Sequence, residues 1–231
     1  MMLATPGLVL HATPYAESSV VAKVFTRQLG VRSYIVNGVR GARGRVKQNM
    51  LQPLTSLDMV VYDNHRTDLN YVKELSPRHP GQSSDPVANA LRFFMTEVLY
   101  KTLREEEPMP QLWDYVEAQA SLGGQQAAHV PIRFMLMVAH HLGIEPLDNH
   151  DLRHPCFDLQ EGRFVPSPTE TTLPPHLSAM LHEYLAAPSQ PAASSLQDRT
   201  DLLNALIAYF QLHLSGFGNF HSHEILHTVL R

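Results

Sequence analysis

The sequence predicts an α+β protein in which a small five-stranded β-barrel precedes an all-α domain. Short segments rich in β-branched and aromatic residues fill positions 5–75, with Gly, Asn, Asp and Pro between them. From position 86 onward, apolar residues instead recur every three or four positions, which is the period of a helix. The Pro-rich stretch 76–86 separates the two patterns. We therefore expect domains at 1–78 and 79–231.

Five strands are expected, at 5–11, 20–26, 31–36, 57–62 and 69–75. Strands this short bury one face most simply by curling into a closed barrel, and an open sheet packed on the next domain is the alternative. Within 31–36, alternation places Val31 and Ile35 on one face and Arg32 and Tyr34 on the other.

The helical domain is expected to begin where Asp85 can cap a helix that has Pro86 at its first position. An apolar stripe continues this helix to about Arg104, and a second helix begins near Leu112. Further helices are expected at 132–142, 177–186, 196–214 and 223–230. The segment 132–142 is apolar nearly all round, which predicts a buried helix, and the Pro-rich insert around 146–176 is expected to be irregular and free of zinc.

The composition is that of a folded protein without membrane spans. Of the 231 residues, 44% are hydrophobic and 17% are charged, and no apolar run reaches the length of a bilayer span. The first residues lack the basic region of a signal peptide. Cys156 is the single cysteine, so an internal disulfide and a four-cysteine zinc site are both excluded. We expect a cytoplasmic protein, associated with the nucleoid if it binds DNA.

The net charge of −4 conceals an uneven distribution of charge along the chain. Residues 1–80 carry ten Lys or Arg and five Asp or Glu, whereas residues 81–231 carry eight and seventeen. Residues 18–57 contain seven cations and no acid at all. This segregation predicts a polyanion partner for the first third of the chain.

The densest cationic segment joins two predicted strands and contains Arg40, Arg43, Arg45 and Lys47 among glycines. Arginine forks match phosphate oxygens, so these four residues are the first candidates for DNA binding. Lys23, Arg27 and Arg32 are the second, and Tyr34 could stack on a base. A solvated basic loop and a core role for Tyr34 are the alternatives. Phosphate-loop and dinucleotide-binding glycine motifs are absent.

One motif suggests catalysis: His223-Glu224-Ile225-Leu226-His227 matches the H-E-x-x-H pattern of zinc hydrolases. In a chain with fourteen histidines the match can arise by chance, and the surrounding residues resemble a closing helix. His150, His154, Cys156 and His176 do not follow a common metal-ligand spacing. We therefore expect no catalytic residues, no metal and no cofactor.

Several short motifs are similar, in order and spacing, to those of the bacterial RecO family of recombination mediators. They are Gly7-Leu8-Val9-Leu10, Tyr15-Ala16-Glu17-Ser18-Ser19, Phe25-Thr26-Arg27-Gln28-Leu29-Gly30, Asn37-Gly38-Val39-Arg40, Leu51-Gln52-Pro53-Leu54, Arg133-Phe134-Met135-Leu136 and Leu142-Gly143. The resemblance implies an N-terminal OB-fold and a helical domain. Many members carry a four-cysteine zinc finger in the helical domain, which this chain cannot form because it has only Cys156 there.

The resemblance also implies partners: single- and double-stranded DNA, RecR, the acidic C-terminal tail of the single-strand-binding protein SSB and, indirectly, RecA. It implies annealing of complementary strands and loading of RecA onto SSB-coated DNA. Arg133, a lone cation on an apolar helix, could meet the SSB tail, and a solvated charge is the alternative.

Two other functions compete with this interpretation. One is a zinc-dependent hydrolase built on His223, Glu224 and His227, and the other is a barrel that binds RNA or another protein. The interpretation as a DNA mediator requires the basic side chains to share one exposed side. It also requires that carboxylates of the helical domain do not neutralise them.

Overall fold

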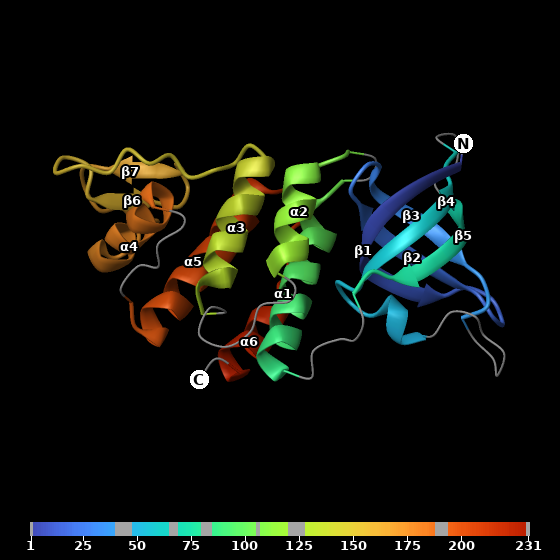
Figure 1. The fold of residues 1–231 in the computed structure, drawn as a ribbon. Helices are drawn as coiled ribbons and strands as arrows, with labels where there is room; N and C mark the ends of the chain where they lie inside the picture. Colours follow the sequence, from blue (N-terminus) through green and yellow to red (C-terminus); the bar gives the residue numbers. More distant parts are fainter. Residues whose placement is uncertain are drawn as a thin grey trace. The chain divides into compact units, whose positions relative to one another are not determined.

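A computed structural model describes residues 2–39, 48–64, 69–79, 85–104, 107–119, 128–187 and 194–229. The chain forms two compact units, Met1–Leu122 and Gly123–Arg231. The first holds the strands β1 to β5 with two helices, and the second holds the remaining helices with a short hairpin (Figure 1). The predicted α+β class, with an OB-type barrel before the helices, is confirmed.

The barrel consists of β1 (Met2–Pro14), β2 (Val20–Thr26), β3 (Gly30–Val36), β4 (Ser56–Tyr62) and β5 (Leu69–Pro77). Their order around the closed barrel is β1-β2-β3-β5-β4. All neighbours are antiparallel except β3 and β5, which pair in parallel. β1 is longer than the predicted strand because its first half, 2–8, pairs with β4 and its second half, 7–14, pairs with β2.

The core of the barrel is largely apolar, and β2, β3 and β4 contribute to it from alternate positions. Its buried members are Val9, Val20, Ala22, Val24, Tyr34, Val36, Val39, Leu51, Leu57, Met59 and Val61. A 3-10 helix, Gln48–Leu51, contributes Leu51 to this core. The closed barrel, rather than an open sheet, is therefore how the five strands bury their apolar faces.

Helices α1 (Pro86–Thr102) and α2 (Pro110–Gln119) belong to the same compact unit as the barrel. As predicted, the Asp85 side chain caps α1 by accepting from the backbone N–H of Val87 at 3.0 Å. Trp113 of α2 is buried and donates from Nε1 to the carbonyl oxygen of Phe25 in β2 at 2.9 Å. The barrel strands end near the predicted boundary at 78, but the division between compact units falls later because α1 and α2 pack with the barrel.

The turn from β2 to β3 shows how closely the segment before α2 approaches the barrel. Gly30 has a φ of +67°, and a Cβ built there would lie 2.4 Å from the carbonyl oxygen of Glu107. Both the left-handed backbone and the close approach require glycine at this position.

The second unit contains α3 (Val130–His141), α4 (Pro175–Ala186), α5 (Leu196–His213) and α6 (Ser222–Val229). α3 is buried over most of its surface, as predicted, and packs on α5. A capping box between Ser195 and Asp198 fixes the start of α5.

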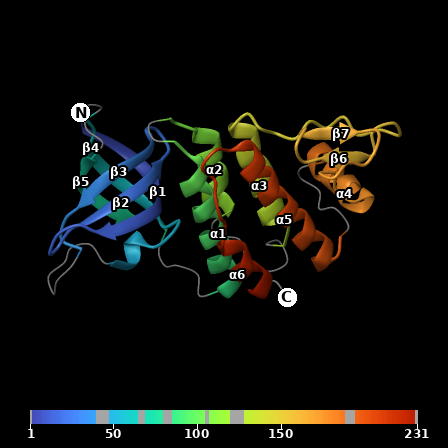
Figure 2. The same cartoon turned by 180° about the vertical axis from the view of Figure 1, so that it is seen from behind.

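The predicted irregular insert is partly ordered, which corrects the sequence analysis. Residues Cys156–Asp158 (β6) and Arg163–Val165 (β7) form a two-stranded antiparallel sheet grouped with α4 (Figures 1 and 2). Each strand has three residues, too few for alternation to be visible in the sequence.

Candidate nucleic-acid interface

The four cations that head the predicted DNA site, Arg40, Arg43, Arg45 and Lys47, lie outside the described residues. The residues that lead into this segment are anchored to the turn between β1 and β2. The backbone N–H of Val39 donates to the carbonyl oxygen of Ser18 at 3.0 Å, and Ser19 Oγ donates to Asn37 Oδ1 at 2.9 Å. Val39, the last described residue before the cationic segment, therefore lies beside that turn.

The two described ends of the cationic segment border the same hollow in the barrel surface. Val39 precedes the segment, Gln48 follows it, and both line an open hollow of about 260 Å³. Its other lining residues are Leu10, His11, Ala12, Pro14, Val20, Leu51, Gln52 and Pro53. The described residues that directly precede and follow the four cations in sequence therefore share one hollow.

Lys23 lies next to that hollow. It pairs in register with His11, which lines the hollow, and its Nζ lies 5.0 Å from the ring centroid of Tyr100 in α1. The rings of His11 and Tyr100 are also close, with centroids 5.4 Å apart. Lys23, His11 and Tyr100, here called the Tyr100 cluster, join β1, β2 and α1. Lys23 was predicted from sequence, whereas His11 and Tyr100 were missed.

Tyr100 could have been identified as a candidate contact residue from its position in the sequence of α1. Tyr100 is not part of the apolar stripe that predicts α1, and 44% of its surface is exposed. A large aromatic residue off the buried face of a helix is a candidate contact, but only the fold brings it to Lys23.

Arg27 is engaged by a carboxylate of α2. Its Nε and Nη2 donate to the two carboxylate oxygens of Asp114 at 2.7 and 2.9 Å, and both side chains are exposed. This hydrogen-bonded pair raises the pKa of Arg27 and lowers that of Asp114. A phosphate would have to displace Asp114 to reach Arg27, so here the requirement for unneutralised cations is not met.

Arg32 and Tyr34 do not form an exposed face, which corrects a second prediction. Their relative exposures are 4% and 0%, because barrel closure turns this face of β3 inward. Arg32 Nε lies 4.0 Å from Asp63 Oδ1, and burial, reinforced by the charge of Asp63, raises the pKa of Tyr34. Tyr34 has the core role that sequence analysis gave as the alternative, and neither side chain can contact a strand at the barrel surface.

The H-E-x-x-H motif lies on α6, where the rings of His223 and His227 meet edge to face with centroids 5.6 Å apart. Within the described part of the chain, no three His, Cys, Asp or Glu side chains gather as a metal site requires. Cys156 is buried in β6.

Hydrogen bonds hold the insert that carries β6 and β7. Asn149 exchanges two of them with the backbone of Phe164, at 2.8 and 2.9 Å. The carboxylate of Asp158 accepts from two backbone N–H groups, of Gln160 and Glu161, and from the hydroxyls of Thr169 and Thr171. These side chains order the insert without requiring a metal ion.

Arg133, predicted to contact an acidic tail, lies on α3 near a second cation, Arg199 of α5. Burial lowers the pKa of His129, and the charges of Arg199 and Arg133 add to that effect. Nε and Nη2 of Arg133 are buried and donate to no acceptor among the described residues. The two cations therefore create a positive potential near the start of α3.

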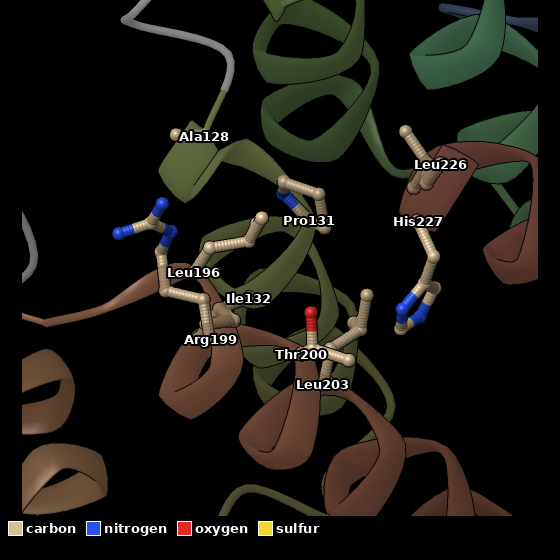
Figure 3. Close-up of a pocket in the computed structure, with 9 residues that line it drawn as sticks. All are labelled: Ala128, Pro131, Ile132, Leu196, Arg199, Thr200, Leu203, Leu226 and His227. Carbon is tan, nitrogen blue, oxygen red and sulfur yellow. The ribbon is translucent and has the colours of Figure 1, made fainter. Parts of the chain in front are cut away.

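A shallow apolar hollow adjoins Arg199 in this unit (Figure 3). It is lined by Ala128, Pro131, Ile132, Leu196, Arg199, Thr200, Leu203, Leu226 and His227, and Arg133 is not among them. Its open volume of about 20 Å³ is roughly the space of one water molecule. None of the described helices is long and apolar enough to span a membrane.

Comparison with known proteins agrees with this architecture. Residues 1–80 match the family model described as "Recombination protein O N terminal". DNA repair protein RecO of Porphyromonas gingivalis is 30% identical, and the match covers 99% of each chain. DNA repair protein RecO of Christiangramia forsetii is 28% identical, and that of Flavobacterium psychrophilum is 27% identical, each again over 99% of both chains. These relatives are named as DNA repair proteins, which supports the prediction of a mediator rather than an enzyme. The chain belongs to the RecO family of DNA repair proteins.

Proposed function

We propose that this chain binds single- and double-stranded DNA and anneals complementary strands. With RecR, it helps load RecA onto SSB-coated single-stranded DNA. The observation that supports DNA binding concerns one region of the barrel surface. The described residues on either side of a segment with four cations, Val39 and Gln48, line one hollow, and Lys23 lies beside that hollow. The family's place in DNA repair supports the rest, including a cytoplasmic location at the nucleoid.

The proposed mechanism requires no covalent chemistry. Two complementary strands repel each other because each carries one negative charge per nucleotide. Cations of the segment 40–47 and Lys23 would neutralise the phosphates of one strand while its bases stay free to pair with a second. Neutralised phosphates release counterions, so binding would weaken steeply as the salt concentration rises.

The SSB tail would bind in the second unit, where Arg133 and Arg199 supply positive charge. A terminal carboxylate would lie at these cations, and an apolar tail residue would enter the hollow of Figure 3. Because the hollow holds only about one water molecule, Leu196 or Leu226 would have to move to admit that residue. An acidic peptide with an apolar end should therefore bind wild type and lose affinity in Arg199→Glu.

The decisive experiment is a salt titration of oligonucleotide binding by the full chain. Reversing Arg40, Arg43, Arg45 and Lys47 to Glu should weaken binding to a single strand. It should also reduce the slope of log K against log salt by up to about 3, or about 0.7 for each lost phosphate contact.

A matched pair of variants separates the site from net charge. Arg43→Glu with Arg45→Glu should lower affinity, whereas Arg153→Glu with Arg163→Glu makes the same change of net charge in the second unit and should have little effect. Equal losses in both double variants, or unchanged binding in the quadruple variant, would remove this site. Stronger binding of RNA than of DNA at fixed salt would favour an RNA-binding barrel.

A further inference from the structure

Tyr100 carries an inference that goes beyond the cationic segment. We propose that an unpaired base stacks on the Tyr100 ring while Lys23 holds an adjacent phosphate, so that this cluster selects single-stranded over double-stranded DNA. The inference deepens the proposed function and rests on it, since it requires that the chain binds DNA.

The first support is the geometry of the Tyr100 cluster. Tyr100 lies in the last two turns of α1 with 44% of its surface exposed, and its ring is 5.0 Å from Lys23 Nζ. The His11 ring lies close to the Tyr100 ring, with centroids 5.4 Å apart and planes inclined at 53°. An exposed aromatic ring beside an ammonium offers both contacts that one nucleotide makes, a surface for the base and a charge for the phosphate.

The second support is the hollow that shares His11 with this cluster. Gln48 and Gln52 line it, and their side-chain amides can both donate to and accept from base edges. Its volume of about 260 Å³ is below the roughly 300–1,000 Å³ of pockets that hold drug-sized ligands, so its size suits a single base. A single strand bound across these described residues would therefore meet, in succession, the hollow, His11 and the Tyr100 ring.

Selection between strand types follows from the need for a free base face. A base in a duplex is stacked on both faces, whereas an unpaired base can leave its neighbours and stack on an aromatic side chain. Stacking on a tyrosine is tolerant of sequence because every base has a flat face. The cluster should thus favour single strands without favouring any sequence.

The test compares two labelled strands of equal length, oligothymidylate and an abasic strand with the same phosphates, together with a duplex. For the full chain, Tyr100→Leu should weaken oligothymidylate binding by between about 5- and 150-fold, the range of one base–aromatic stack. Binding to the abasic strand and to the duplex should hardly change. Tyr100→Phe keeps the ring and should bind all three as wild type does.

Two further variants complete the design. Tyr62→Leu removes an equally exposed ring from β4 and should leave oligothymidylate binding unchanged. Lys23→Gln should weaken binding to oligothymidylate and to the abasic strand alike, because its proposed contact is with phosphate. It should also reduce the salt slope for single strands by about 0.7.

A fluorescence measurement tests the stacking without depending on whether Tyr100→Leu folds as wild type does. In Tyr100→Trp, a stacked base should quench the new indole on addition of oligothymidylate but not of the abasic strand. The native Trp113 is buried and supplies a constant background.

The outcomes separate this inference from the proposed function. Wild-type affinity of Tyr100→Leu for oligothymidylate, equal loss on the abasic strand, or an unquenched indole would overturn the stacking role while DNA binding stands. Failure of the wild-type chain to bind any of the three nucleic acids would overturn the proposed function and the inference together.

Discussion

At the scale of single residues, three predicted cations have three different environments. Lys23 lies over an exposed ring, Arg27 is paired with Asp114, and Arg32 is inside the barrel 4.0 Å from Asp63. The sequence alone places all three in one second group of candidates, because it shows their charge but not their surroundings. Whether a cation can bind phosphate depends on its burial and on the carboxylates and rings around it, and only the folded chain shows these.

Removing the carboxylate that holds Arg27 should make the cation available to DNA. We expect Asp114→Asn to bind oligonucleotides more tightly at low salt and to increase the salt slope by up to about 0.7. Thermal stability should change little because the pair is exposed. Asp201→Asn, which removes one negative charge from α5, is the control and should leave affinity unchanged. Identical affinities of Asp114→Asn and wild type would mean that Arg27 does not contact DNA.

At the scale of elements, side-chain hydrogen bonds order the insert that carries β6 and β7. The sequence of this insert shows no periodic pattern from which its structure could be predicted. Asp158 is 2% exposed and accepts four hydrogen bonds, from the Thr169 and Thr171 hydroxyls and two backbone N–H groups. Burial opposes its ionisation, but these hydrogen bonds hold the pKa of Asp158 below its usual range. The charged form is therefore the one that stabilises the insert.

Asp158→Asn should lower the free energy of unfolding by about 1–3 kcal/mol at neutral pH, because an amide nitrogen cannot accept these hydrogen bonds. A lowered pKa means that the folded state binds the proton less tightly than the unfolded state does. The contribution of Asp158 is thus present above the usual carboxyl pKa and is lost as pH falls through its lowered folded-state value. The stability gap between wild type and variant should accordingly narrow in acid.

The measurement is denaturant unfolding followed by circular dichroism at several pH values, with hydrogen exchange of the Gln160 and Glu161 amides as a local readout. Asp151→Asn changes a similar but exposed turn of the same insert and serves as the control. An equal effect of the two substitutions, or a gap that widens in acid, would contradict the role assigned to Asp158.

At the scale of the whole molecule, the uneven charge and the single cysteine limit what the chain can do. The first third is basic and the remainder acidic, which suits a protein that binds a polyanion at one end. Many members of the RecO family carry a four-cysteine zinc finger in the helical domain. This chain cannot form one because it has a single cysteine. The described residues also bring no three metal-binding side chains together, in α6 or elsewhere.

A chelator should therefore leave the protein unchanged. We expect EDTA to alter neither the Tm nor the oligonucleotide affinity of protein purified without a histidine tag. Elemental analysis of the same sample should find no stoichiometric zinc. Bound zinc with peptidase activity would instead support the hydrolase built on His223, Glu224 and His227.

Local patterns in the sequence determined most element positions. The predicted strand at 20–26 agrees with β2, and the predicted helix starting at Pro86 agrees with α1, because β-branched runs and a capped Pro are short-range signals. The strands β6 and β7 were not predicted, because three residues are too few to show the alternation of apolar and polar residues that indicates a strand.

The sequence alone determined three features: the segregation of charge, the absence of a four-cysteine zinc finger, and the order of a barrel before helices. These features depend only on composition and on the local period of apolar residues. Only the tertiary structure decided which face of β3 lines the barrel interior, since alternation defines two faces and both are buried here. It also decided that Asp114 reaches Arg27 and that Tyr100 reaches Lys23. Such contacts join residues far apart in the chain, and no local pattern encodes the packing of α1 and α2 with the barrel that creates them.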